Sequence, residues 1–210
     1  MTRAREFANF GSDAPSAIGT AGQALLVNSG ATAYEWAEAG GGATEFIASS
    51  GAISSGTANV SFTQFDASKY DYYKFAFHSV IPLTDNQELL GQLSANGTSY
   101  DSTNGSYHSN GTTDKTGLTI SYYGVGAESG ELIGFNGEAL IFNAGSTTRP
   151  TVSLAYGASQ YPNGTDNVTG GSNSGNFYQA STVAHTAIRF LFTSGNINSG
   201  EIVMYGIKNS

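Results

Sequence analysis

Carboxylates are the residues of this sequence with the clearest capacity for covalent chemistry. Glycoside hydrolysis needs two of them on either side of a groove, one as the acid and the other as nucleophile or base. Five candidates lie in the middle of the chain: Asp101, Asp114, Glu128, Glu131 and Glu138. Because any chain with 16 acidic residues contains such pairs, we predict that the protein is not an enzyme. A polysaccharide-degrading enzyme stays as an alternative, with Glu128, Glu131 and Glu138 as its first candidates.

Metal and cofactor chemistry has little support. The chain has no Cys, so a thiolate metal site is excluded. His78, His108 and His185 lie in different segments, without the spacing of metal ligands. Residues 101–105 and 163–167 offer oxygen atoms of the kind that calcium accepts, but neither run has EF-hand spacing. We predict no metal and no cofactor, and we leave a structural calcium ion open.

Two long polar stretches, residues 96–117 and 157–175, are predicted to be loops. Their Asn-Gly steps suit turns with positive φ. Both stretches also carry aromatic residues, which supply contact area at a low entropy cost. We therefore predict a ligand-binding surface on these loops, formed by Tyr100, Tyr107, Tyr161, Asn104, Asn110 and Asn163. The alternative is that the rings only pin the loops to the domain.

The composition restricts the class of protein and of partner. Gly, Ser, Thr and Asn make up about two-fifths of the chain, above their usual share, and 12% of the residues are aromatic, which argues against disorder. The net charge of −8 and the scattered basic residues disfavour nucleic-acid binding. No apolar run reaches the ~18 to 20 residues of a membrane span, and the first ten residues lack the apolar stretch of a signal peptide. We expect neither nucleic-acid binding nor membrane insertion.

After the Gly40–Gly42 joint, short apolar runs recur with turn residues between them. Residues 60–65 and 189–192 alternate between apolar and mixed side chains, as half-buried strands do. About ten strands in about 165 residues favour a jelly-roll-like antiparallel β-sandwich over residues 43–210. The predicted strands are residues 44–48, 58–65, 70–80, 88–95, 118–123, 138–142, 151–156, 177–180, 187–193 and 201–207.

Residues 1–42 form a separate N-terminal segment in this interpretation. A hairpin is predicted, with strands at residues 23–28 and 31–36 joined by a turn at Ser29-Gly30. A lone hairpin is marginal in water, so it must pack against another part of the chain, other copies or a larger assembly. We predict an attachment and oligomerisation surface in this segment, formed by Phe7, Phe10, Leu25, Val27, Tyr34 and Trp36.

The segment Gly19-Thr20-Ala21-Gly22-Gln23-Ala24-Leu25, followed by Gly30 and Trp36, resembles the G-T-x-G-Q-x-L...W unit of tailed-bacteriophage fibres. Residues 187–197, with Ser199-Gly200 and Met204-Tyr205-Gly206, resemble the closing strands of a β-sandwich domain of phage fibre and virion-appendage proteins. Residues 80–86 are similar to an inner strand and loop of the same domain.

The resemblance implies a virion structural protein that forms a homotrimer. Residues 1–42 would dock on other virion proteins, and the sandwich would face outward. Because the chain has one shaft unit where longer members have many, the resemblance favours a short appendage on the tail or capsid surface. We expect a fibre or spike component that binds a glycan or protein of the host surface. A capsid fibre or decoration protein with a structural role is the alternative.

Overall fold

The computed structural model describes residues 23–27, 30, 33–38, 43–109, 112–121, 124–127, 134–159, 172–178 and 183–208. The chain divides into two units, Met1–Gly42 and Ala43–Ser210, at the glycine run where the sequence predicts a boundary. No helix occurs in the part of the chain that the structure describes.

The first unit contains the predicted hairpin. β1 (Gln23–Val27) pairs antiparallel with β2 (Tyr34–Glu38), and Leu25 lies opposite Trp36. The predicted tight turn is wrong, because Val27 pairs with Tyr34 and residues 28–33 connect the strands. The longer connection brings the bulky Trp36 opposite Leu25, a pairing that stabilises a sheet. Phe7 and Phe10 lie outside the described residues.

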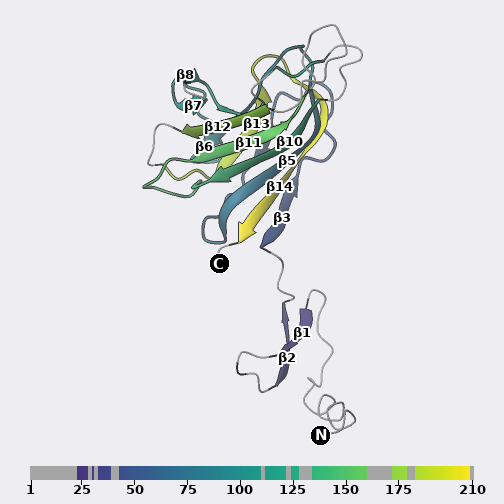
Figure 1. Cartoon of the computed structure of the whole chain (residues 1–210), viewed down its shortest axis with the longest axis vertical. Helices are drawn as coiled ribbons and strands as arrows, with labels where there is room; N and C mark the ends of the chain where they lie inside the picture. The colour runs from purple at the N-terminus through teal and green to yellow at the C-terminus, as the bar shows by residue number, and fades with distance from the viewer. Residues whose placement is uncertain are drawn as a thin grey trace. The chain divides into compact units, whose positions relative to one another are not determined.

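The second unit is an all-β sandwich of antiparallel sheets (Figure 1). Its strands are β3 (Thr44–Ser49), β4 (Val60–Phe62), β5 (Tyr70–Pro82), β6 (Leu89–Ser94), β7 (Tyr107–Ser109), β8 (Thr112–Lys115), β9 (Leu118–Thr119), β10 (Phe135–Phe142), β11 (Val152–Ala158), β12 (Ser172–Tyr178), β13 (Ala187–Phe192) and β14 (Ile197–Lys208). The eight-stranded large sheet has the order β3-β14-β5-β10-β11-β12-β7-β8. The four-stranded small sheet has the order β4-β13-β6-β9.

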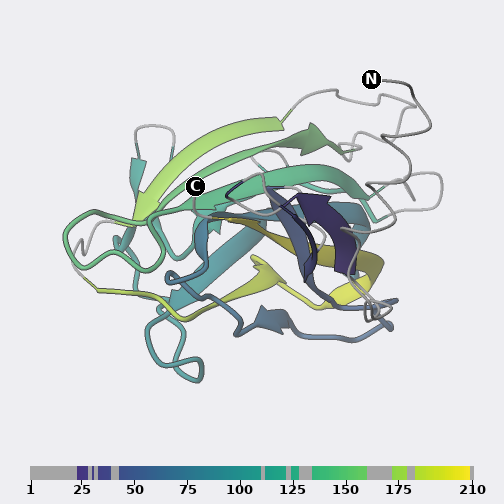
Figure 2. The ribbon, with the colours of Figure 1, turned by 90° about the horizontal axis from the view of Figure 1, so that it is seen from below.

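The strand order is that of a jelly roll. Without β7, β8, β11 and β12, the large sheet reduces to β3-β14-β5-β10, which faces the small sheet β4-β13-β6-β9 (Figure 2). The chain alternates between these sheets from β3 to β6, returns along the small sheet at β9, and alternates again from β10 to β14. Two four-stranded sheets wound in this way are the double Greek key of a jelly roll. The predicted fold class is confirmed.

Aromatic rings fill the space between the sheets. On β5 the inward residues are Tyr73, Phe75 and Phe77, each at most 2% exposed. Phe190 on β13 enters from the small sheet, with its ring centroid 4.9 Å from that of Phe75 and 5.1 Å from that of Phe77. Burial of each such side chain contributes about 1.5–3 kcal/mol. The predicted alternation around Phe62 and Phe190 therefore does mark the core face.

Both predicted long loops contain strands, which corrects the sequence interpretation. β7 and β8 lie within residues 96–117. β12 begins within residues 157–175 and ends at Tyr178, inside the predicted strand 177–180, and β11 extends to Ala158. These strands extend one end of the large sheet. Backbone pairing holds such strands without a strong apolar pattern, and for that reason their Asn-, Ser- and Thr-rich sequences resemble loops. The Asn-Gly prediction is confirmed at Gly97 and Gly105, whose φ values are +74° and +90°.

Candidate functional site

The structure separates the tyrosines that the sequence groups as ligand-binding. Tyr107 is fully buried, and its hydroxyl donates to the Asp101 carbonyl at 2.9 Å and accepts from the Leu93 amide at 3.0 Å. Tyr107 therefore belongs to the core, as a hydrogen-bonded link between strands, and cannot contact a ligand. Tyr100 is half-buried and Asn104 is exposed in a turn. Tyr161, Asn110 and Asn163 lie outside the described residues.

The strongest candidate surface is the outer face of the large sheet, which the sequence did not single out. Four side chains form a row across four adjacent strands, from β14 through β5 and β10 to β11. They are Tyr205, Lys74, Glu138 and Tyr156. Register places Tyr205 opposite Lys74, and Glu138 opposite Tyr156. The row could not be predicted from the sequence, because each of its four residues comes from a different strand.

Polar contacts connect the row along its length. The Lys74 ammonium lies 5.2 Å from the centroid of the Tyr205 ring and 3.2 Å from one oxygen of Glu138. The Tyr156 hydroxyl donates to the other oxygen of Glu138 at 2.5 Å. The hydrogen bond from Tyr156, followed by that from Lys74, lowers the pKa of Glu138, and the same carboxylate raises the pKa of Tyr156. The charged groups of Lys74 and Glu138 and the Tyr156 hydroxyl are thus each held in place by a neighbour.

Exposed apolar side chains surround this row. Phe46 on β3 is 60% exposed and packs edge-on against Tyr205, with 6.2 Å between the ring centroids. Leu154 on β11 is 46% exposed and pairs with Leu140 on β10. Tyr156 itself is 43% exposed. Exposed apolar side chains that gather on one sheet face mark a recognition surface more often than scattered ones do.

A second cluster lies on the outer face of the small sheet. The guanidinium of Arg189 on β13 stacks over the Tyr100 ring, 4.7 Å from its centroid. Its Nε donates to the side-chain oxygen of Gln92 on β6 at 2.9 Å. Gln92 is only 4% exposed and donates in turn to the Thr116 carbonyl. One predicted site residue, Tyr100, is thus brought next to a cation from a distant part of the sequence, Arg189.

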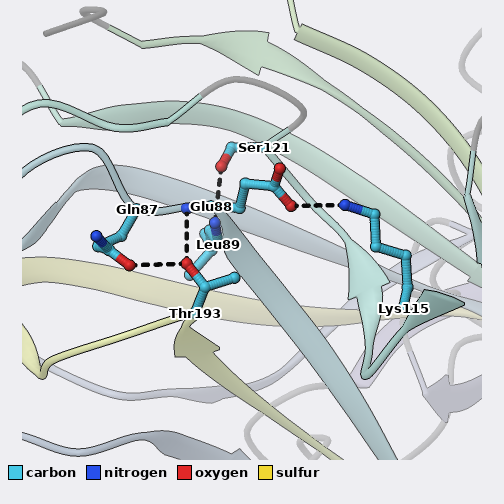
Figure 3. Close-up of polar contacts among 6 residues, drawn as sticks. All are labelled: Gln87, Glu88, Leu89, Lys115, Ser121 and Thr193. Atoms are coloured by element: carbon cyan, nitrogen blue, oxygen red, sulfur yellow. Dashed lines mark hydrogen bonds and ion pairs between the residues drawn. The ribbon is translucent and has the colours of Figure 1, made fainter. Parts of the chain in front are cut away.

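A polar network at the start of β6 is structural. Figure 3 shows its six residues, Gln87, Glu88, Leu89, Lys115, Ser121 and Thr193. Lys115 pairs with Glu88 at 3.1 Å. The Thr193 hydroxyl accepts from the Glu88 amide, and the Ser121 hydroxyl accepts from the Leu89 amide at 2.7 Å. These contacts hold the start of β6 against its neighbours. The polar atoms of the network bond to one another within the chain.

His185 is a buried histidine. It is 5% exposed, and its Nδ1 lies 2.8 Å from the hydroxyl of Thr151, which is 1% exposed. Burial lowers the pKa of His185 to about 4, against the opposing effect of the Asp101 charge. The imidazole is therefore neutral at pH 7. Because neither His185 nor Thr151 reaches the surface, this pair is positioned to stabilise the fold and not to meet a substrate.

The carboxylates proposed for hydrolysis do not come together in the described residues. Glu138 contacts Lys74 and Tyr156 and no second carboxylate. Asp101 accepts from the Thr103 amide in a turn, whereas Glu128 and Glu131 lie outside the described residues. In that same part of the chain, no group of three or more His, Asp or Glu side chains could hold a metal ion.

No family model matches this sequence, and neither a curated protein nor a solved structure matches it. Within the described ranges there is no helix of the length and apolar character needed to cross a membrane.

Proposed function

We propose that this protein is a bacteriophage virion component whose jelly roll binds a glycan on the host surface. The observation that carries the proposal is the row of Tyr205, Lys74, Glu138 and Tyr156 on the outer face of the large sheet. Support for the virion context comes from the fibre-like segment at residues 19–36 and its hairpin. The ligand would therefore bind the outer face of the large sheet and not the loops at residues 96–117 and 157–175.

The chemistry of the row suits a saccharide. Tyrosine rings offer flat apolar surfaces to the C–H faces of a sugar and hydroxyl groups at their edges. Lys74 donates hydrogen bonds and Glu138 accepts them, so both can pair with sugar hydroxyls. Four strands at 4.7–4.9 Å spacing span about 14 Å. A surface of that length favours an oligosaccharide over a single sugar.

Oligomerisation would raise the affinity of such a shallow surface. Linked copies convert later binding steps into intramolecular ones and can increase avidity by a factor on the order of 10² or more. The hairpin leaves Leu26 41% and Val27 57% exposed, and together with Leu25, Tyr34 and Trp36 these side chains would contact sister chains or a virion neighbour. We propose a homotrimer, which sedimentation analysis of the full chain would test. A monomer at micromolar concentration would contradict it.

A glycan array with the full chain tests the binding function. We expect wild type to bind a subset of glycans, and Tyr156→Ala to reduce that affinity about fivefold, since one aromatic contact contributes about 1 kcal/mol. Leu83→Ala is the matched control, because Leu83 is 52% exposed and lies outside the row. A folded wild-type protein that bound no glycan and no host cell would contradict the proposal.

A structural role as a capsid decoration protein is the second candidate. It is favoured by the apolar border of the row, Phe46, Leu140 and Leu154, which could pack against a neighbouring virion protein. Electron microscopy of intact particles separates the candidates. Copies in threefold sets at the tail would support the adhesin, whereas copies across the capsid with this sheet face covered would support decoration.

A further inference from the structure

Arg189 differs from the lysines of the described chain in its lack of a carboxylate partner. Each lysine with a described ion pair contacts a glutamate: Lys69, Lys74, Lys115 and Lys208. Among the described residues, no acidic side chain lies within ion-pair distance of Arg189 or Arg149. Arg149 stands on an exposed turn. Arg189 is half-buried on a sheet face, in a protein of net charge −8.

The Arg189 side chain is held in one orientation from two sides. The guanidinium lies over the Tyr100 ring, and its Nε donates a hydrogen bond to the side-chain oxygen of Gln92 at 2.9 Å. The Gln92 amide is itself fixed, because its nitrogen donates to the Thr116 carbonyl at 2.9 Å. The Nε hydrogen is used in this arrangement, and the hydrogens of the two terminal Nη groups are left for a ligand. A carboxylate can accept from both Nη groups as a parallel pair of hydrogen bonds.

The neighbouring strand β4 and the segment that precedes it supply groups of another kind. Ser61 on β4 lies directly opposite Arg189 and lines a hollow of about 360 Å³. The other polar side chains of this hollow include Ser54, Thr57 and Asn59. Hydroxyl and amide groups both donate and accept, which matches the hydroxyls of a saccharide. The hollow thus lies along the segment before β4 and reaches β4 at Val60 and Ser61, beside the strand that carries Arg189.

We propose that Arg189 binds the carboxylate of an acidic saccharide, whose hydroxyl groups lie toward the hollow beside Ser61. Tyr100 and Gln92 are the positioning residues that hold the guanidinium. The site lies on the small sheet, and it is therefore independent of the row on the large sheet and of the glycan proposed there. It gives the predicted site residue Tyr100 a specific role in place of a general stacking surface.

Titration calorimetry of the full chain with oligogalacturonate and with hyaluronan oligosaccharides tests the site. We expect wild type to bind at least one of them, and the methyl esters of the same saccharides to bind at least tenfold more weakly, because esterification removes the charged acceptor. Addition of salt should weaken the binding of the acids more than that of the esters. Failure of both acidic saccharides to bind, or equal affinity for acid and ester, would overturn the proposal.

Two substitutions of Arg189 separate recognition from folding. Arg189→Gln should reduce the affinity at least tenfold, whereas Arg189→Lys, which keeps the charge and loses the planar pair of donors, should retain an intermediate affinity. Arg149→Gln is the matched control, with the same loss of charge on an exposed turn, and should bind as wild type does. Thermal unfolding establishes that each variant is folded.

Three outcomes would contradict the assignment. Wild-type affinity in folded Arg189→Gln would show that this residue does not bind the ligand. An equal loss in Arg149→Gln would show that net charge alone is responsible. Tighter binding of an oligoglutamate peptide than of either acidic saccharide would assign the site to an acidic peptide and reject the saccharide.

Discussion

Tyr156 and Glu138 lie opposite each other on β11 and β10, and the Tyr156 hydroxyl donates a hydrogen bond to the Glu138 carboxylate. This bond is the largest cause of the lowered pKa of Glu138, ahead of Lys74. It also fixes the carboxylate while the Tyr156 ring stays exposed. The pair is therefore preorganised in the free protein, with its remaining acceptor sites available to a ligand.

Replacement of Tyr156 by Phe should raise the pKa of Glu138 toward its ordinary value of 4.5. The hydrogen bond favours the ionised carboxylate, and its loss removes that preference. A titration of the glutamate side-chain carbons by NMR measures the change. Tyr72→Phe is the control, since Tyr72 lies on the same sheet face and its ring packs against Phe142. An unchanged pKa in Tyr156→Phe would show that Lys74 alone holds the carboxylate ionised.

Replacement of Tyr107 by Phe should destabilise the sandwich by about 1–3 kcal/mol, the cost of unpaired buried polar groups. The change removes a hydroxyl that serves both the Leu93 amide and the Asp101 carbonyl. Urea unfolding measures the free-energy difference. Tyr100→Phe should change stability much less, because the Tyr100 hydroxyl lies 3.5 Å from its acceptor and is only partly buried. Equal stability of the two variants would reject the structural role of Tyr107.

The fold was predictable where apolar side chains alternate along a strand. Phe62 and Phe190 mark the core face from sequence alone, and both are buried in the structure. β7, β8 and the first part of β12, before the predicted strand at residues 177–180, were not predictable, because backbone pairing to neighbouring strands holds these polar segments in the sheet. The burial of Tyr107 was not predictable for the same reason, because it depends on a sheet that the local sequence does not indicate.

The candidate site was less predictable than the fold. Lys74, Glu138 and Tyr156 approach one another only through the register of β5, β10 and β11, and no short motif encodes that register. Tyr100 was identified by its type and its polar context, but its partner Arg189 lies 89 positions later in the chain (189 − 100). Long-range pairing between strands therefore determines both clusters.

The free energy of unfolding should decrease as the pH is lowered, because of the titration of His185. Its pKa is lowered to about 4 in the folded protein and returns to about 6.5 on unfolding, so the unfolded chain binds the proton first as the pH decreases. The stabilisation is complete above about pH 6.5 and is lost progressively toward pH 4, by up to about 3 kcal/mol. Urea unfolding at several pH values measures the slope of the free energy of unfolding against pH.

The matched variants for this prediction are His185→Gln and His78→Gln. His185→Gln should flatten the slope between pH 4 and pH 6.5, since it removes the group whose proton affinity differs between the two states. His78→Gln should keep the slope, because His78 is exposed. If both variants retained the wild-type slope, carboxylates and not His185 would account for the acid sensitivity.

Residues 1–42 expressed alone should be largely unstructured. The described strands of this segment form a single two-stranded hairpin, which is marginal in water without a further surface to cover it, and Leu26 and Val27 are exposed in it. Circular dichroism and amide chemical-shift dispersion measure the extent of folding. Addition of a trimerisation domain to the fragment should increase its strand content if sister chains supply the missing contacts. A fragment that folded as a stable monomer would remove the physical reason for assembly through this hairpin.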